Sequence, residues 1–311
     1  MARSLRDIRR KMKAIKSTRQ VTKAMELVAA SKMRRAVQNT QMLRRYALTA
    51  SRILESIADV HPDLHPYLSK RPSEKILAVL FTSDRGLCGS LNTQLFRTGT
   101  SYIRSLKTLS SFQSLEWVAV GRKGQQFLAR SNEKVSAAFP ALSNHPTFQD
   151  VLPIVRLLTE GFLSQKYDQV VLVYTDFVSA LLQEPTVKVL LPFSKTTLKE
   201  MLESLLPRRS KNQQTNKPAN QKPSVKEYLF EPSQTEILRT ILPQLTEIQV
   251  YQAVLEAAAS EHSARMVAMR SASDNASDIL DDLTLTANQT RQAGITAEIS
   301  EISGAKAALE G

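Results

Sequence analysis

The chain has little of several things that would define its class. It contains one cysteine, Cys88, so no internal disulfide is possible, and this fits a reducing compartment. No run of 18 or more apolar residues occurs, which argues against a membrane-spanning helix. The first residues show no apolar core of a signal peptide. Glycine is scarce, with 9 in 311 residues, and both glycine and proline are missing from residues 3–58.

The stretch 3–58 therefore predicts one long helix. Its apolar and small residues recur at steps of three and four, the heptad-like spacing of a helix that packs along another helix. At roughly 55 residues it would be about 80 Å long. The predicted seam is Leu5, Ile8, Met12, Ile15, Thr22, Met25, Ala29, Met33, Ala36, Thr40, Leu43, Ala47, Ala50, Leu54 and Ile57.

A second long helix is predicted from about Pro243 to Leu309, preceded by a short helix that begins at a capping box, Ser233 to Glu236. At about 65 residues it would be roughly 100 Å long, too long to bury its apolar stripe in an ordinary domain without a partner. The predicted stripe is Leu245, Ile248, Leu255, Ala258, Met269, Ala272, Ala276, Ile279, Leu283 and Thr286.

The charges of the two ends are opposite. Residues 1–60 hold 15 Lys and Arg against 4 Asp and Glu, whereas residues 233–311 hold 5 against 11. Opposite charge favours the two helices as neighbours, although each could also be a solvated face. We therefore predict an antiparallel two-helix coiled coil. The basic face of the first helix could serve nucleic acid or an acidic protein, and the scarcity of aromatic residues there favours protein.

The middle of the chain alternates strand and helix patterns and predicts a Rossmann-like α/β domain. The domains are then 1–60, 61–232 and 233–311, with a polar, mobile loop at 207–224. Strands are expected at 76–83, 115–120, 169–175 and 187–191, the last of them antiparallel, and helices at 91–109, 122–130 and 148–165.

No motif in this domain indicates catalysis, a cofactor or a metal. Gly121-Arg-Lys-Gly124 is too short a match for a dinucleotide fingerprint and is interpreted as a tight turn. His61 and His65 have metal-ligand spacing, but Pro62 and Pro66 break the helix that would present them together, so this segment is interpreted as a linker.

Three motifs, in order along the chain, carry a resemblance to a known family. They are Ile8 to Ala36 with Val21-Thr-Lys-Ala-Met25 at its centre, the loop Asp84-Arg-Gly-Leu-Cys-Gly89, and Ser260 to Leu309 with Arg291-Gln-Ala-Gly-Ile-Thr-Ala-Glu. With them the chain resembles the gamma subunit of F-type ATP synthases. The long 207–224 loop departs from typical bacterial relatives, and the paired-cysteine insert of chloroplast relatives is missing.

The resemblance implies a central rotor shaft, a non-catalytic subunit that couples ion flow through a membrane c-ring to conformational cycling of the beta-subunit sites. Its partners would be the alpha and beta subunits, the epsilon subunit and the c-ring. It would lie peripherally on the cytoplasmic face of the bacterial cell membrane, without inserting into it. The alternative from charge alone is a basic nucleic-acid-binding coiled-coil protein.

The resemblance also implies contact residues. A neck cluster of Met25, Arg265 and Gln292 would lie near a beta-subunit carboxylate, and Arg85 and Cys88 would face a beta subunit from the foot loop. The upper contact with the alpha–beta ring would use Arg291, Gln292, Thr296 and Glu301. Tyr228 would contact the c-ring or epsilon. No catalytic, cofactor-binding or metal residue is implied.

Overall fold

The computed structural model describes residues 5–56, 65–69, 71–108, 110, 112–144, 146–193 and 234–310, without the side chains of 44–56, 234–235, 237 and 307–310. The chain divides into two compact units, Met1–Ala30 with Arg265–Gly311, and Ser31–Ala264. The two long helices, α1 (Leu5–Ser56) and α6 (Gln234–Glu310), contribute to both units, and each unit is described by itself. The 207–224 loop and Tyr228 lie outside the described residues.

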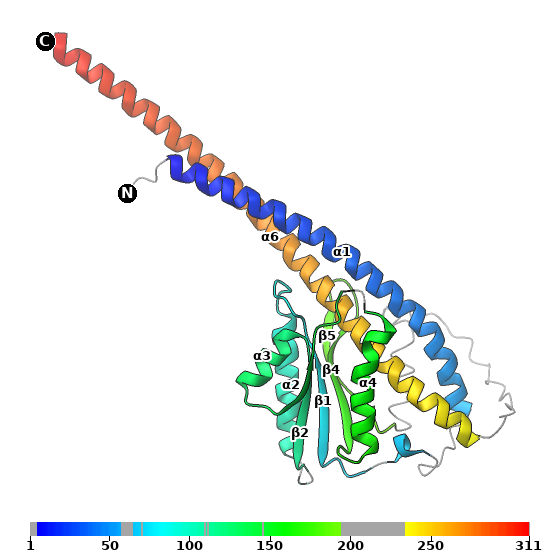
Figure 1. Ribbon diagram of the computed structural model, residues 1–311. Helices are drawn as coiled ribbons and strands as arrows, with labels where there is room; N and C mark the ends of the chain where they lie inside the picture. The colour runs from blue at the N-terminus through cyan, green and yellow to red at the C-terminus, as the bar shows by residue number, and fades with distance from the viewer. Residues whose placement is uncertain are drawn as a thin grey trace, which may run out of the picture. The chain divides into compact units, whose positions relative to one another are not determined.

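The first unit is an antiparallel pair of helix segments, as predicted (Figure 1). On α1 the predicted seam positions up to Met25 are buried or half-buried, with Ile8 and Thr22 almost inaccessible. On α6 the facing stripe is Met269, Ser273, Ala276, Leu280 and Leu283. The predicted stripe was therefore wrong at Ile279, which is 47% exposed. The stripe shifts to Ser273 and Leu280 because a sustained seam follows alternating steps of three and four.

A hydrogen bond between the two helices defines the register of this unit. Arg19 Nη1 donates to Ser277 Oγ at 3.3 Å. Counting 14 residues along each helix from that contact places Leu5, the first described residue of α1, level with about residue 291 of α6. Beyond that level α6 continues without α1 beside it (Figure 1).

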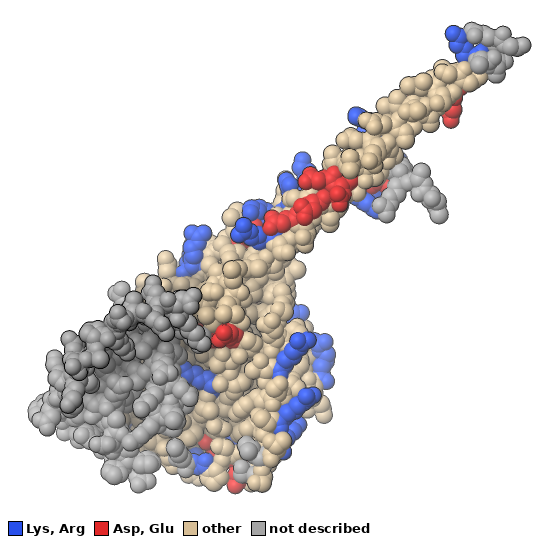
Figure 2. All heavy atoms as spheres, turned by 180° about the vertical axis from the view of Figure 1, so that it is seen from behind, with Lys and Arg blue, Asp and Glu red and all other residues tan. Residues whose placement is uncertain are grey.

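The opposite charges of this unit lie on exposed surfaces. Asp274, Asp278, Asp281 and Asp282 are exposed on α6 and form an acidic band with basic side chains next to it (Figure 2). Two ion pairs of α1 are local, Arg10 with Asp7 at 3.3 Å and Lys23 with Glu26 at 3.0 Å. Exposed pairs of this kind contribute little, so the buried seam accounts for most of the association.

The second unit is built around a five-stranded sheet in the order β3-β2-β1-β4-β5. The strands are β1 (Lys75–Phe81), β2 (Ser114–Val120), β3 (Val135–Phe139), β4 (Gln169–Phe177) and β5 (Gln183–Leu191). The first four are parallel and β5 is antiparallel to β4, as the short connection predicted. Strand β3 was not predicted, because its residues are largely exposed and carry no buried apolar run.

Helices cover both faces of the sheet. On one face α2 (Leu91–Lys107) and α3 (Arg122–Arg130) pack on Ile76, Ala78 and Leu80, with the buried Trp117 among them. On the other face α4 (Phe148–Leu163), the first part of α6 and the short 3-10 helix η2 (Pro66–Leu68) pack on Leu77 and Val79. Alternate residues of each strand thus supply the two cores. His65, predicted to lie in a linker, caps η2 by accepting the Tyr67 N–H at Nδ1.

The predicted break at Pro243 was wrong, because α6 runs through it as one helix. Proline removes one backbone hydrogen bond, but Leu242 and Leu245 on either side are buried at 0% and 1% exposure. Pro153 lies inside α4 in the same way, so the interruption of this helix that Pro153 predicts from sequence was also wrong. Burial of the flanking apolar residues outweighs the local cost in both helices.

Candidate functional site

The loop after β1 carries one of the family motifs and is held rigidly at its base. Asn92 closes it: its Nδ2 donates to Ser83 Oγ at 2.8 Å, and its Oδ1 accepts the Ser83 N–H at 3.3 Å. Ser83 Oγ in turn donates to the Arg85 carbonyl at 2.8 Å. These contacts tie the start of α2 to the end of β1.

Asp84 anchors the same loop to two neighbouring segments. One carboxylate oxygen accepts the Arg122 N–H at 2.8 Å, and both accept the Ala141 N–H at 3.3 Å. Arg122 is the first residue of α3, and the first backbone N–H groups of a helix have no partner within the helix and favour an anion. The anion at this helix terminus is therefore the chain's own carboxylate.

The Gly121–Gly124 turn is confirmed as a close backbone approach. Gly121 has φ +98°, and a Cβ there would lie 2.1 Å from the Thr82 carbonyl oxygen. The Gly124 N–H donates to Thr82 Oγ1 at 2.8 Å. Both glycines are needed so that the β1 loop can reach α3, and no phosphate is required to explain them.

The exposed residues of the loop are Arg85 to Leu87 and Gly89, and Cys88 between them is buried. Leu87 has φ +64° and is 61% exposed, whereas the Cys88 thiol is 2% exposed and lies 3.4 Å from Asn92 Nδ2, which donates to it. Because Cys88 is buried, a partner could reach its thiol only if the loop opened, so the expected contact at Cys88 would be transient. Arg85 and Leu87 present the accessible surface instead.

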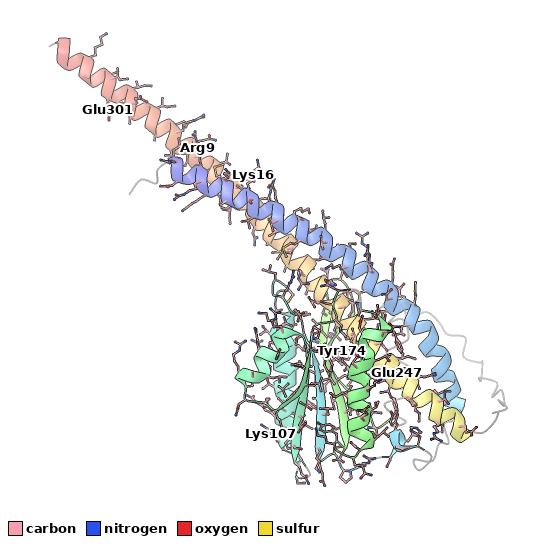
Figure 3. The ribbon with its side chains drawn as sticks, in the orientation of Figure 1. Arg9, Lys16, Lys107, Tyr174, Glu247 and Glu301 are labelled. Atoms are coloured by element: carbon pink, nitrogen blue, oxygen red, sulfur yellow. The ribbon has the colours of Figure 1, made fainter. Side chains whose placement is uncertain are left out.

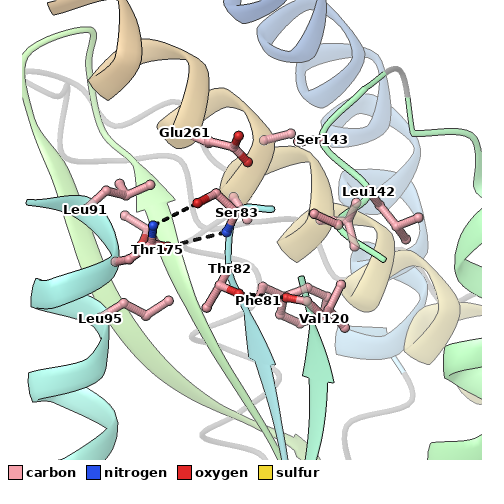
Figure 4. Close-up of a pocket in the computed structure, with 15 residues that line it drawn as sticks. Phe81, Thr82, Ser83, Leu91, Leu95, Val120, Leu142, Ser143, Thr175 and Glu261 are labelled. Atoms are coloured by element: carbon pink, nitrogen blue, oxygen red, sulfur yellow. Dashed lines mark hydrogen bonds between the residues drawn. The ribbon is translucent and has the colours of Figure 1, made fainter. Parts of the chain in front are cut away.

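The crevice at the carboxyl ends of β1 and β4 is where open α/β sheets usually bind ligands, because the strand order reverses there. Here α6 fills it: Val254, Ala257 and Glu261 line the same cavity as Ser83 and Thr175 (Figure 4). Ser260 Oγ also donates to the Thr175 carbonyl at 3.0 Å. The remaining cavity of about 20 Å³ has room for a water molecule and none for a nucleotide.

The predicted upper contact residues lie on the part of α6 that extends past α1. Arg291, Gln292, Thr296 and Glu301 are all exposed, and Figure 3 shows Glu301 near the end of the helix. Thr296 Oγ1 donates to the Gln292 carbonyl at 3.0 Å, which leaves its lone pairs for a neighbour.

Exposed isoleucines accompany these polar residues. Ile295, Ile299 and Ile302 are 50%, 58% and 66% exposed and follow steps of four and three, so they share one face. Arg291 and Gln292 flank that face on opposite sides. An apolar stripe exposed on a lone helix indicates a surface that another protein covers.

The neck cluster is contradicted in part by the helix register. Met25 is half-buried on the seam of α1 and lies level with about residue 271 of α6, six residues from Arg265. Gln292 lies about 30 Å further along the helix axis at 1.5 Å per residue. Gln292 therefore belongs with the upper residues and not with Met25, because the two positions are on opposite sides of the Arg19–Ser277 contact.

Comparison with known proteins identifies the class to which this architecture belongs. A family model described as ATP synthase matches residues 4–309. The ATP synthase gamma chain of Roseiflexus castenholzii is 41% identical over 98% of both chains, and that of Opitutus terrae is 42% identical over 97% of this chain and 98% of the relative. Neither relative supports the alternative of a nucleic-acid-binding protein.

Solved structures of ATP synthases also contain chains that are similar to this one. A chain in the central stalk and c-ring structure of the Tetrahymena thermophila mitochondrial ATP synthase matches with a TM-score of 0.56 at 25% identity, over 81% of this chain and 99% of that one. A chain of the Euglena gracilis mitochondrial ATP synthase shares the fold, with a TM-score of 0.62 at 21% identity, over 98% and 94%. The chain belongs to the family of ATP synthase gamma chains. Among its described helices, none has the length and apolarity to cross a membrane.

Proposed function

We propose that the chain is the central rotor shaft of an F-type ATP synthase and couples ion flow through a c-ring to the cycling of beta-subunit sites. The observation that carries the assignment is the lone, exposed end of α6, where an isoleucine face is flanked by Arg291 and Gln292. Such a surface can contact a surrounding ring of alpha and beta subunits through few polar groups and release it as the shaft turns.

The remaining contacts in this proposal come from three places. Arg85, with Leu87 beside it, meets a beta subunit from the foot, and Arg265 near Met25 meets a beta-subunit carboxylate at the neck. Tyr228, outside the described residues, contacts the c-ring or epsilon. The chain carries no catalytic residue and lies peripherally on the cytoplasmic face of the bacterial cell membrane, where the complex transports hydrogen ions.

The test replaces Arg291, Gln292, Thr296 and Glu301 together by alanine. Because all four side chains are exposed, the free energy of unfolding of the isolated chain should change by less than about 0.5 kcal/mol per position. Assembly with alpha and beta subunits and ATP turnover of the complex should both fall. A matched control replaces Gln94, Arg97, Ser101 and Arg104, which are exposed on α2, and should assemble and turn over like the parent.

If the quadruple variant of α6 assembles and turns over like the parent, the contact set is wrong. If the α2 control is equally impaired, the loss does not report on the end of α6 and the assignment of the upper contact is also rejected.

A further inference from the structure

Where α6 crosses β4 and the β4–β5 turn, it presents buried polar side chains. Ser263 Oγ donates to the Ala180 carbonyl at 2.6 Å, one turn after the Ser260 contact with Thr175. Glu256 lies one turn before Ser260 and is 3% exposed. The helix is thus attached to the edge of the sheet by polar groups, and Glu256 is an acid among them.

The groups around Glu256 come from three elements. On α6 itself, Gln252 Nε2 donates to Glu256 Oε1 at 2.8 Å. From β4, Asp176 shares a hydrogen bond with Glu256. From β5, Lys188 is close enough to act on its charge, and Glu184 lies directly opposite Asp176 in the strand ladder.

The strand alternation explains why these groups meet. Tyr174, labelled in Figure 3, and Leu190 belong to the core under α4 and α6. Asp176, two residues from Tyr174, shares that face, and Glu184 and Lys188 share it because they are an even number of residues from Leu190. Helix α1 approaches Ala258 and Ala259, close by on α6, through the apolar residues Ala36 and Val37.

The Glu256 carboxyl is buried and the Asp176 carboxyl beside it is half-buried, so the two cannot both be ionised cheaply, because the site offers little solvation and the charges repel. Burial, with the Asp176 charge beside it, raises the pKa of Glu256 to about 7, while Gln252 and Lys188 act in the opposite direction. Near neutral pH the pair therefore changes between holding a proton and losing it to solvent.

We propose that Glu256 and Asp176 form a proton-dependent latch that holds α6 on the β4–β5 hairpin while one proton is shared and loosens when that proton is lost. The latch regulates how stably the sheet of the α/β domain packs against α6. It does not depend on the rotor assignment, since every group in it belongs to the second unit of this chain.

The direction of the pH effect follows from the raised pKa of Glu256. The stabilisation is fully present below the ordinary value of 4.5 and is lost as pH rises through about 7. The interval of about 2.5 units sets an upper limit of about 300-fold on the change in the opening equilibrium. Because a window from pH 5.5 to 8.5 leaves out the part of the change that falls between pH 4.5 and 5.5, we expect at least about tenfold over that window.

The experiment is hydrogen exchange, read by mass spectrometry on the β5 amides of the full chain at several pH values and corrected for the intrinsic pH dependence of exchange. The parent should show increasing exchange above neutral pH. Glu256→Gln keeps the shape but cannot ionise, so its opening equilibrium should be flat with pH. Asp176→Asn removes the neighbouring charge, so its transition should move to a different pH.

Glu261→Gln is the matched control, because Glu261 is also buried on α6 but one turn beyond the latch. It should keep the parent's pH profile. The four histidines are present in every variant, so they cannot cause a difference between variants. Fluorescence of the single tryptophan, Trp117, checks that each variant is folded.

A parent profile that is flat with pH would overturn the proposal, and so would a Glu256→Gln profile identical to the parent's. If Glu256→Gln does not fold, Asp176→Asn decides alone: a transition at an unchanged pH rejects the latch, and a shifted one supports it.

Discussion

Replacement of Asp84 by alanine tests the idea that the family loop is held by the chain's own helix terminus. The variant removes the acceptor of the Arg122 and Ala141 N–H groups. A lost helix cap costs about 1 kcal/mol, and a lost charge at a helix N-terminus costs about 0.3–1 kcal/mol. Arg122 is exposed, so water replaces part of the loss. We expect a decrease of about 1–2 kcal/mol in the free energy of unfolding of the α/β unit.

Urea unfolding followed by Trp117 fluorescence measures this change, because Trp117 is 1% exposed in the same sheet. With a slope of about 2–3 kcal/mol per molar urea, the midpoint should fall by about 0.5 M. Asp84→Asn keeps an acceptor without the charge and should lose about half as much. Glu160→Ala removes an exposed acid from α4 and should be neutral. An Asp84→Ala midpoint within about 0.1 M of the parent's, which corresponds to about 0.2–0.3 kcal/mol at this slope, would refute the anchoring role.

Three further predictions follow from single residues. Glu116 accepts from Tyr167 and pairs with Lys134 and Lys166, and the Lys134 hydrogen bond first, then Tyr167, lower its pKa to about 2. The stability that the Glu116 carboxylate contributes is present above pH 4.5 and is lost as pH falls towards 2. In acid titrations of the free energy of unfolding, Glu116→Gln should flatten that loss. At pH 7 the same variant should cost about 1 kcal/mol, because both lysines are largely exposed. Gly121→Ala should lower the free energy of unfolding by more than about 3 kcal/mol, because of the close approach at Thr82. Gly294→Ala, with nothing within 4 Å of the added Cβ, should instead raise the helicity measured by circular dichroism. Equal effects of the two variants would contradict the close approach at Thr82. Met25→Lys should reduce ion pumping by the assembled complex more than its assembly, and normal pumping in vesicles would reject the neck contact.

The regular elements were predictable because their burial is periodic. The α1 seam and the strand at residues 169–175 follow from the spacing of apolar residues, and the antiparallel direction of the fourth predicted strand follows from its short connection. Strand β3 could not be found this way, since only two of its five residues are even half-buried. The prediction of a helix break at Pro243 was wrong because a proline inside the helix is tolerated when Leu242 and Leu245 are buried. That burial arises from tertiary packing and cannot be read from the local sequence.

For the candidate contact residues, the sequence could predict exposure on a helix surface, and their role stays a prediction. Exposed polar residues near the end of a long helix, such as Thr296, could be placed from periodicity and family resemblance. The burial of Cys88 depends on Asn92 folding back over the loop, and the separation of Met25 from Gln292 depends on the register at Ser277. Neither contact has a signal in the spacing of residues along the chain. The raised pKa of Glu256 could not be predicted either, because it depends on burial of the side chain and on Asp176 lying beside it.

Because α6 fills the crevice at the ends of β1 and β4, a small molecule would have to compete with α6 for this position. A small molecule that sought this position would have to displace a segment of α6 that is covalently part of the same chain. A tethered segment acts at an effective concentration of about millimolar or more, without ever diffusing away. The crevice that serves related architectures as a receptor is here permanently occupied, and its occupant is the chain's own long helix.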